Sequence, residues 1–314
     1  MRNVLILFLL SSWSLQAQDK SGITGKPDTS FSNYSAWKNL LKEDPTVQLA
    51  QVQSSKSKKQ RPNFKVQSSV YKVVGTRKLV VDEYALSASV KLPTLIFFHG
   101  GGWRTGHRSQ HIPLAKALSD RGYRVFLVEY RLSTEALYPA AMLDAQAALQ
   151  WVSKRKNVGE IYVAGYSAGG QMAALLGSVQ DENTYGKRVK VAGVIDIDGI
   201  LAFIHPESGE GDDSKRTSAA TYYFGYNKKE GEAIWKEASA LSHVTKGDPP
   251  VLFLNSGVDR MHAGRTDFID KMAELGIHTE YYTFEKAPHT FVLMNHWFDQ
   301  VVDRMDRFMR KRLY

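Results

Sequence analysis

A serine flanked by small residues is the best candidate for nucleophilic chemistry in this chain. Residues 165–169 read GYSAG, after the β-favouring run 161–164 and before the helix-favouring run 171–176. A tight strand-to-helix turn lifts such a serine hydroxyl clear of the sheet, and glycines let strand and helix approach closely. The pattern therefore predicts that Ser167 is a nucleophile.

A glycine-rich segment upstream is suited to stabilising an oxyanion. Residues 99–103 read HGGGW and follow the apolar run 94–98. Negative charge that develops on a carbonyl oxygen is stabilised by backbone N–H groups where no side chain blocks the approach. The alternative interpretation, a phosphate-binding turn, lacks an accompanying G-x-G-x-x-G or G-x-x-x-x-G-K pattern. We expect the donors to be the N–H groups of Gly101, Gly102 and Ala168. The amide of Trp103 is a further candidate.

The base for this serine is sought downstream, because acid and then base follow a serine on such a turn. The histidines beyond Ser167 are His205, His243, His262, His278, His289 and His296. His289 follows the strand-like run 279–284 and precedes the last helical segment, which is where the base belongs, so we predict His289 as the base. His262 is the strongest alternative, whereas His296 opens an apolar and aromatic helix and is predicted to pack.

The acid is predicted to be Asp259, which follows the strand-like run 251–254 and a few small residues. Such a carboxylate orients the imidazole and stabilises its protonated form. Asp198, which ends the preceding strand-like segment, is an open alternative, and weaker alternatives are Asp267 and Glu285.

The strings HGGGW and GYSAGG resemble those of the esterase and lipase branch of the α/β hydrolases. The resemblance covers about residues 66–314 and implies an α/β fold with triad chemistry. The segments 194–203, 262–265 and 288–291 resemble carbohydrate esterases of gut Bacteroidetes, in particular a pectin methylesterase group. In that group the position of Asp259 is not always acidic, which keeps Asp198 open.

Strand-like and helical runs alternate along most of the chain, which predicts a mostly parallel, eight-stranded sheet covered by helices on both faces. The strand-like runs are 70–74, 78–81, 94–98, 124–129, 161–164, 189–196, 251–254 and 279–284. The helical runs are 112–121, 140–154, 170–179, 266–275 and 298–312. The region 200–245 departs from the alternation and is predicted to form a small cap, whose aromatic residues either stack on sugars or pack onto the core.

Composition supports one large exported domain. The chain has 314 residues, of which 43% are hydrophobic, and no cysteine, which excludes disulfides and thiolate catalysis. Residues 1–17 read as a cleavable signal peptide and 18–65 as an extended lead-in or linker, which predicts a periplasmic or secreted protein without a stable membrane anchor. The net charge of +9 favours acidic polysaccharide as a partner, and nucleic acid is disfavoured for an exported chain.

We therefore predict a serine carboxylester hydrolase that uses no metal and no cofactor. The favoured substrate is the methyl ester of uronic acids in pectin, a plant polysaccharide, and acetyl or feruloyl esters are the alternative. An inactive sugar-binding protein is the alternative from another class. We expect Trp103, Arg104 and Arg265 to contact the substrate. The two arginines would bind a carboxylate of the substrate.

Overall fold

The computed structural model describes residues 22–51, 65–86, 89–179 and 182–311. The expected signal peptide, residues 1–17, and the basic stretch 52–64 of the expected linker lie outside these residues. Among the helices described, none is long and apolar enough to cross a membrane.

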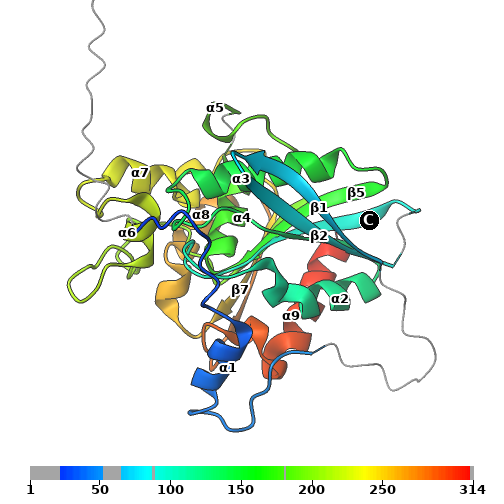
Figure 1. The fold of residues 1–314 in the computed structure, drawn as a ribbon, viewed down its shortest axis with the longest axis horizontal. Helices are drawn as coiled ribbons and strands as arrows, with labels where there is room; N and C mark the ends of the chain where they lie inside the picture. The colour runs from blue at the N-terminus through cyan, green and yellow to red at the C-terminus, as the bar shows by residue number, and fades with distance from the viewer. Residues whose placement is uncertain (1–21, 52–64, 87–88, 180–181, 312–314) are drawn as a thin grey trace, which may run out of the picture.

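An eight-stranded sheet runs through the centre of the molecule (Figure 1). Its spatial order is β1-β2-β4-β3-β5-β6-β7-β8, with antiparallel pairing from β1 to β2 and from β2 to β4 and parallel pairing between all other neighbours. The strands are β1 Lys65–Val74, β2 Arg77–Ala85, β3 Leu92–Phe98, β4 Arg124–Val128, β5 Val158–Tyr166, β6 Gly193–Ile197, β7 Val251–Ser256 and β8 Thr279–Phe284. The mostly parallel sheet predicted from the sequence is confirmed, although β6 is shorter than the predicted run 189–196.

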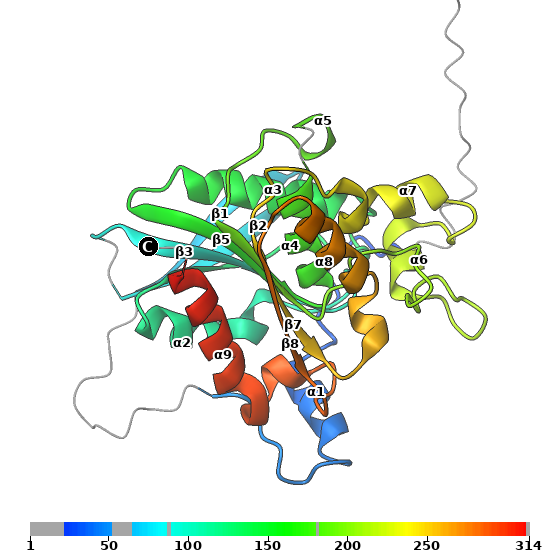
Figure 2. The same ribbon diagram turned by 180° about the vertical axis from the view of Figure 1, so that it is seen from behind.

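Helices cover both faces of the sheet (Figures 1 and 2). One apolar core lies under α3 Ala140–Ser153, α4 Ala168–Ser178 and α8 Arg265–Glu274, and the other under α2 Ile112–Asp120 and α9 Asn295–Arg310. Every residue of α4 is buried, whereas α9 buries one stripe at three- and four-residue spacing, formed by Phe298, Val301, Val302, Met305, Phe308 and Met309. The strands between the two cores are correspondingly apolar on both sides, and β4 and β7 are buried throughout.

The N-terminal segment 22–51 packs on the domain, which differs from the extended lead-in that the sequence predicts. Its helix α1 Asn33–Leu40 begins at Ser32, which accepts a hydrogen bond from the N–H of Ser35. Upstream of α1, the backbone of Asp28 forms an isolated parallel β-bridge with Thr105. Downstream of α1, the N–H of Ala50 donates to Leu293 O at 2.9 Å. The segment therefore connects the glycine-rich loop after β3 to the start of α9.

The region 200–245 forms the predicted cap, with α6 Ala219–Phe224 and α7 Glu232–Glu237 (Figure 1). The aromatic rings of Tyr223, Phe224 and Trp235 are buried, with Phe224 and Trp235 at a centroid distance of 4.8 Å. Most of the cap's aromatic residues therefore pack onto the core. This agrees with the second of the two interpretations of the sequence, packing rather than stacking on sugars. A short helix, α5 Glu182–Tyr185, lies outside the cap.

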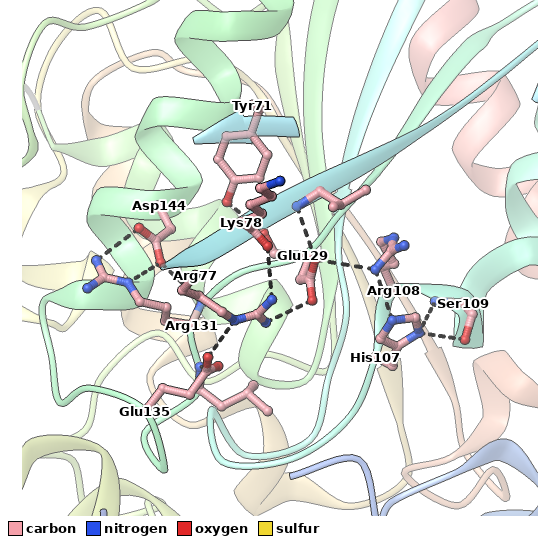
Figure 3. A network of polar contacts seen from close by, with 12 residues as sticks. Tyr71, Arg77, Lys78, His107, Arg108, Ser109, Glu129, Arg131, Glu135 and Asp144 are labelled. Carbon is pink, nitrogen blue, oxygen red and sulfur yellow. Dashed lines mark hydrogen bonds and ion pairs between the residues drawn. The ribbon is translucent and has the colours of Figure 1, made fainter. Parts of the chain in front are cut away.

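Ion pairs fix the segment that follows β4 (Figure 3). Arg131 reaches Asp144 of α3 through two contacts, Nε to Oδ2 at 2.8 Å and Nη2 to Oδ1 at 2.9 Å. Lys72 of β1 contacts the same carboxylate at 2.6 Å. Arg77 of β2 makes further pairs of 2.8 and 2.7 Å with Glu129 and Glu135. The segment 129–135 is thus tied to the first two strands and to α3.

Replacing Asp144 by Ala should destabilise the fold strongly. The carboxylate is fully buried, and its removal leaves Arg131 and Lys72 without their common partner. Breaking such a buried pair lowers the free energy of unfolding by about 3–5 kcal/mol. Urea unfolding should therefore show a lower midpoint for the Asp144 variant. Glu232→Ala removes an exposed partner of Lys236 and should leave the midpoint almost unchanged. Equal midpoints for both variants would contradict the structural role of Asp144.

Candidate active site

Ser167 lies on a sharp turn between β5 and α4. Its backbone has φ 56° and ψ −120°, a conformation that residues with a side chain rarely adopt. A Cβ atom at Gly165 would lie 2.0 Å from Gly169 O, and one at Gly169 would lie 2.1 Å from Phe98 O. The two glycines of the GYSAG string are therefore required because backbone atoms occupy the space of their missing side chains.

A continuous chain of hydrogen bonds joins a serine, a histidine and an aspartate. Ser167 Oγ lies 2.9 Å from His289 Nε2, and His289 Nδ1 lies 2.8 Å from Asp198 Oδ2. The Asp198 side chain is fully buried, and its Oδ1 accepts the N–H of Ser256 at 2.8 Å. Because an ionised carboxylate only accepts hydrogen bonds, the imidazole proton belongs on Nδ1, which leaves Nε2 to accept from the Ser167 hydroxyl.

Asp259 does not take part, so the sequence-based prediction of Asp259 as the acid is wrong in this structure. Its side chain is 93% exposed, and its Oδ1 lies 3.9 Å from His262 Nε2 rather than near His289 Nδ1, which is bound by Asp198. Asp198 follows β6, the direct neighbour of β5, whereas Asp259 follows β7, one strand farther from the serine. Both aspartates stand just after a strand, so the linear sequence could not separate them; the sheet order does.

The other candidate acids and bases lie elsewhere. Asp267 contacts His205 at 3.2 Å, and Glu285 lies on the exposed turn after β8. His262 is buried in the 3₁₀ turn Asp259–His262, where burial lowers its pKa, and it makes no contact with Ser167 in the described part of the chain. His296 contacts Asp44 at 3.3 Å.

The glycine-rich loop presents backbone N–H groups beside Ser167. Gly101 has φ 123°, and a Cβ atom there would lie 1.9 Å from Thr105 O, so only glycine fits this turn. The turn is closed by the N–H of Thr105, which donates to Gly101 O at 3.0 Å. Within the residues described, no protein acceptor faces the N–H groups at the three predicted oxyanion-hole positions, which border the same cleft: Gly101, Gly102 and Ala168.

Buried contacts hold this loop from behind. The hydroxyl of Tyr130 donates to His99 O at 2.8 Å, and the two rings stack at a centroid distance of 4.4 Å. Burial lowers the pKa of His99 to about 4, so its ring is neutral at pH 7. The N–H of Ser133 donates to Trp103 O at 2.7 Å. The ion-paired segment 129–135 therefore fixes the position of the loop.

Ser167 and His289 border a cleft of about 690 Å³ between the sheet and the cap. The loop after β3, the cap and the turn after β7 all contribute to its walls. Phe31 of the N-terminal segment also borders the cleft, and sequence reasoning missed it because nothing in the segment's composition or spacing connects it to the site.

The three residues expected to contact substrate have different positions. Arg104 and Trp103 both border the cleft. Trp103 is only 4% exposed, and its indole N–H donates to Gln171 Oε1 at 2.9 Å. Arg265 does not border the cleft, since its Nη1 donates to Asn255 Oδ1 at 2.8 Å behind the turn after β7. The expectation that Arg265 grips a substrate carboxylate is therefore wrong.

Much of the chain matches a known protein family. A model of the BD-FAE family matches residues 83–263, more than half of the chain. The chain belongs to the BD-FAE family. It is also similar to the carboxylesterase NlhH of Mycobacterium tuberculosis, with 38% identity over 27% of this chain and 28% of NlhH. A versiconal hemiacetal acetate esterase of Aspergillus parasiticus is 30% identical over 39% of this chain and 38% of its own length. The chain thus spans well under half of these relatives.

Solved structures show a similar fold. Esterase Est2 of Thermogutta terrifontis with bound butyrate has a TM-score of 0.64 and 23% identity, over 80% of this chain and 94% of that one. A truncated carbohydrate esterase from gut microbiota has a TM-score of 0.62 and 17% identity, over 81% of this chain and 98% of that one. The fold of this BD-FAE protein is the α/β-hydrolase fold, as the sequence predicts. Its resemblance to pectin methylesterases stays a prediction.

Clusters of potential metal ligands are absent from the described residues. Within the described ranges, no group of three or more His, Cys, Asp or Glu side chains is placed to hold a metal ion.

Asp198→Asn should lower kcat for an ester substrate by about 10⁴-fold, because an amide at this position favours the wrong imidazole tautomer. Asp259→Asn is the matched control, since that side chain is exposed and forms no hydrogen bond or ion pair with His289 in the described residues. Steady-state hydrolysis of p-nitrophenyl acetate measures both. A larger loss in Asp259→Asn than in Asp198→Asn would restore the assignment made from the sequence.

Proposed function

We propose that this protein is a serine carboxylester hydrolase. The observation that carries the proposal is the unbroken chain from Asp198 through His289 to the Ser167 hydroxyl, which opens into the cleft beside unpaired backbone N–H groups. Matching carboxylesterases over part of the chain support the same activity.

Acylation follows from the geometry. Ser167 Oγ attacks the ester carbonyl carbon while its proton passes to His289 Nε2, 2.9 Å away. The N–H groups of the glycine-rich loop and of Ala168 stabilise the oxyanion. His289 then gives its proton to the leaving alkoxide, which departs as an alcohol and leaves an acyl group on Ser167.

Deacylation uses the same residues with water as the nucleophile. Water gives a proton to His289 and attacks the acyl carbon, and the tetrahedral intermediate then breaks the bond to Ser167 Oγ. The serine recovers its proton from His289, and the acid leaves. Asp198 keeps the imidazole oriented and stabilises its positive charge in both halves.

For the substrate we propose the methyl ester of a uronic acid in a pectic polysaccharide. The net charge of +9 and the arginine residues that border the cleft support an acidic polymer. A similar fold in a carbohydrate esterase from gut microbiota is compatible with this substrate class. The residues that would contact the sugar include Arg104 and Trp103, which border the cleft.

An acetyl or feruloyl ester is the second candidate. The specific observation in favour of the acetyl ester is the partial match to a versiconal hemiacetal acetate esterase. An inactive sugar-binding protein would require that no base reach Ser167, and the 2.9 Å contact with His289 argues against this.

Product analysis separates these substrates. Incubation with methyl-esterified and acetylated pectin should release methanol without acetate, and Ser167→Ala should lower the rate by about 10³-fold or more because the nucleophile is lost. Release of acetate without methanol would replace the methylesterase proposal by the second candidate. A Ser167→Ala variant that keeps most of its activity on p-nitrophenyl acetate would contradict the serine mechanism.

We also propose that the protein is exported to the periplasm or secreted. The support is the sequence of residues 1–17, a basic start followed by an apolar run that ends at small residues. Mass spectrometry of the protein from fractionated cells should show a mature chain that begins at Gln18. An intact N-terminus in the cytoplasmic fraction would contradict export.

A further inference from the structure

Three arginines from different parts of the chain border the cleft around Ser167. Arg104 follows the glycine-rich loop, Arg216 belongs to the cap, and Arg260 lies in the 3₁₀ turn after β7. In the described residues none of them forms an ion pair or donates a hydrogen bond to a protein acceptor. Five arginines of the scaffold do form ion pairs, namely Arg77, Arg108, Arg121, Arg124 and Arg131. Others outside the cleft, such as Arg155 and Arg304, only lie over an aromatic ring, so it is the shared position at the cleft that sets the three arginines apart.

Arg104 is held in place without having its donors satisfied. Its guanidinium lies 4.1 Å from the centroid of the Tyr222 ring. Gly22 lies against the guanidinium, so that a Cβ atom there would be 2.9 Å from Nη1. Nη1 is buried and has no hydrogen-bond partner. Because Nη1 is enclosed, a ligand in the cleft would meet the other guanidinium nitrogens, for which the described residues supply no acceptor either.

The acidic residues that border the cleft form no ion pair with these arginines in the part of the chain that the structure describes. Glu210 Oε2 accepts the N–H of Ala220 at 2.9 Å, and Asp212 Oδ1 accepts the N–H of Ser214 at 3.2 Å. Each of these carboxylates therefore accepts a hydrogen bond from a backbone N–H group of the cap. Asp198 is paired with His289. Besides the backbone N–H groups next to Ser167, the side-chain donors without an acceptor at this cleft include these three guanidinium groups.

We propose that Arg104, Arg216 and Arg260 form a carboxylate-binding subsite beside the ester-cleaving serine. A guanidinium presents parallel N–H donors that match the two oxygens of a carboxylate. The substrate class is an ester that carries a free carboxylate on a neighbouring group. This inference rests on the proposed ester hydrolysis and refines its substrate.

A polyuronate fits this requirement when some of its esters are already cleaved. In a fully methyl-esterified chain the sugars next to the reacting ester carry no charge. In a partly de-esterified chain they carry carboxylates that the arginines can bind. The enzyme should therefore prefer the partly de-esterified polymer and bind its own acidic product.

The direct test uses unesterified trigalacturonate as an inhibitor of p-nitrophenyl acetate hydrolysis. We expect competitive inhibition of the wild-type enzyme and a rise in the inhibition constant of about tenfold in Arg216→Gln or Arg260→Gln, the effect of losing one charge-assisted hydrogen bond. Both side chains are exposed, so their replacement does not disturb the core. Arg104→Gln should show a rise at least as large.

Lys215→Gln is the matched control, because it removes the same charge from the neighbouring exposed position, which does not border the cleft. Its inhibition constant should equal that of the wild type. An equal rise in Lys215→Gln and Arg216→Gln would overturn the subsite, since a general attraction of anions would explain both.

A second ligand separates the possible sources of the carboxylate. Glutarate that inhibits with the same dependence on the arginines supports recognition of any carboxylate, and inhibition by trigalacturonate alone supports a uronate subsite. A wild-type enzyme that hydrolyses p-nitrophenyl acetate but is not inhibited by either anion would overturn the subsite and leave the proposed hydrolysis standing. If p-nitrophenyl acetate is not hydrolysed, the proposed function fails, and calorimetric titration with trigalacturonate tests the subsite alone.

Discussion

In the turn between β5 and α4, the carbonyl oxygen of Phe98 occupies the space that a side chain on residue 169 would need. A Cβ atom on Gly169 would lie only 2.1 Å from this oxygen. This close backbone contact brings the start of α4 against the ends of β3 and β5. Ser167 is held there at φ 56°, at a cost of about 1–3 kcal/mol that the surrounding packing offsets. The position of the hydroxyl relative to His289 and to the glycine-rich loop depends on this contact.

Local patterns predicted the parts of the site that local structure determines. The GYSAG and HGGGW strings are recognisable in the sequence because each combines glycines with a preceding strand-like run, so they identify Ser167 and the oxyanion loop without a structure. Gly165 and Gly101 are required by backbone atoms a few residues away, whereas Gly169 is required by the distant Phe98 O. His289 was found because it follows the last strand. The acid was assigned incorrectly because Asp198 and Asp259 both follow a strand, and only the pairing of β5 with β6 shows which lies nearer to the serine.

Features that depend on distant contacts were not predictable. The segment 22–51 has one weak helical pattern, yet its pairing of Asp28 with Thr105 brings Phe31 to the cleft. Arg265 and Arg104 looked equivalent in the sequence. One donates to Asn255 away from the cleft, and the other keeps an unsatisfied donor within it. That Arg104, Arg216 and Arg260 border one cleft emerges only from the three-dimensional structure.

Covalent labelling of the nucleophile tests the central claim most directly. Diethyl p-nitrophenyl phosphate reacts with a serine only when a neighbouring base activates it, and the reaction leaves a stable phosphoryl group on the oxygen. Intact mass and peptide mapping should show one such group per chain, on Ser167, with labelling greatly slowed in His289→Ala. Labelling at another residue, or equally fast labelling in the His289 variant, would contradict the account of Ser167 as a serine activated by His289.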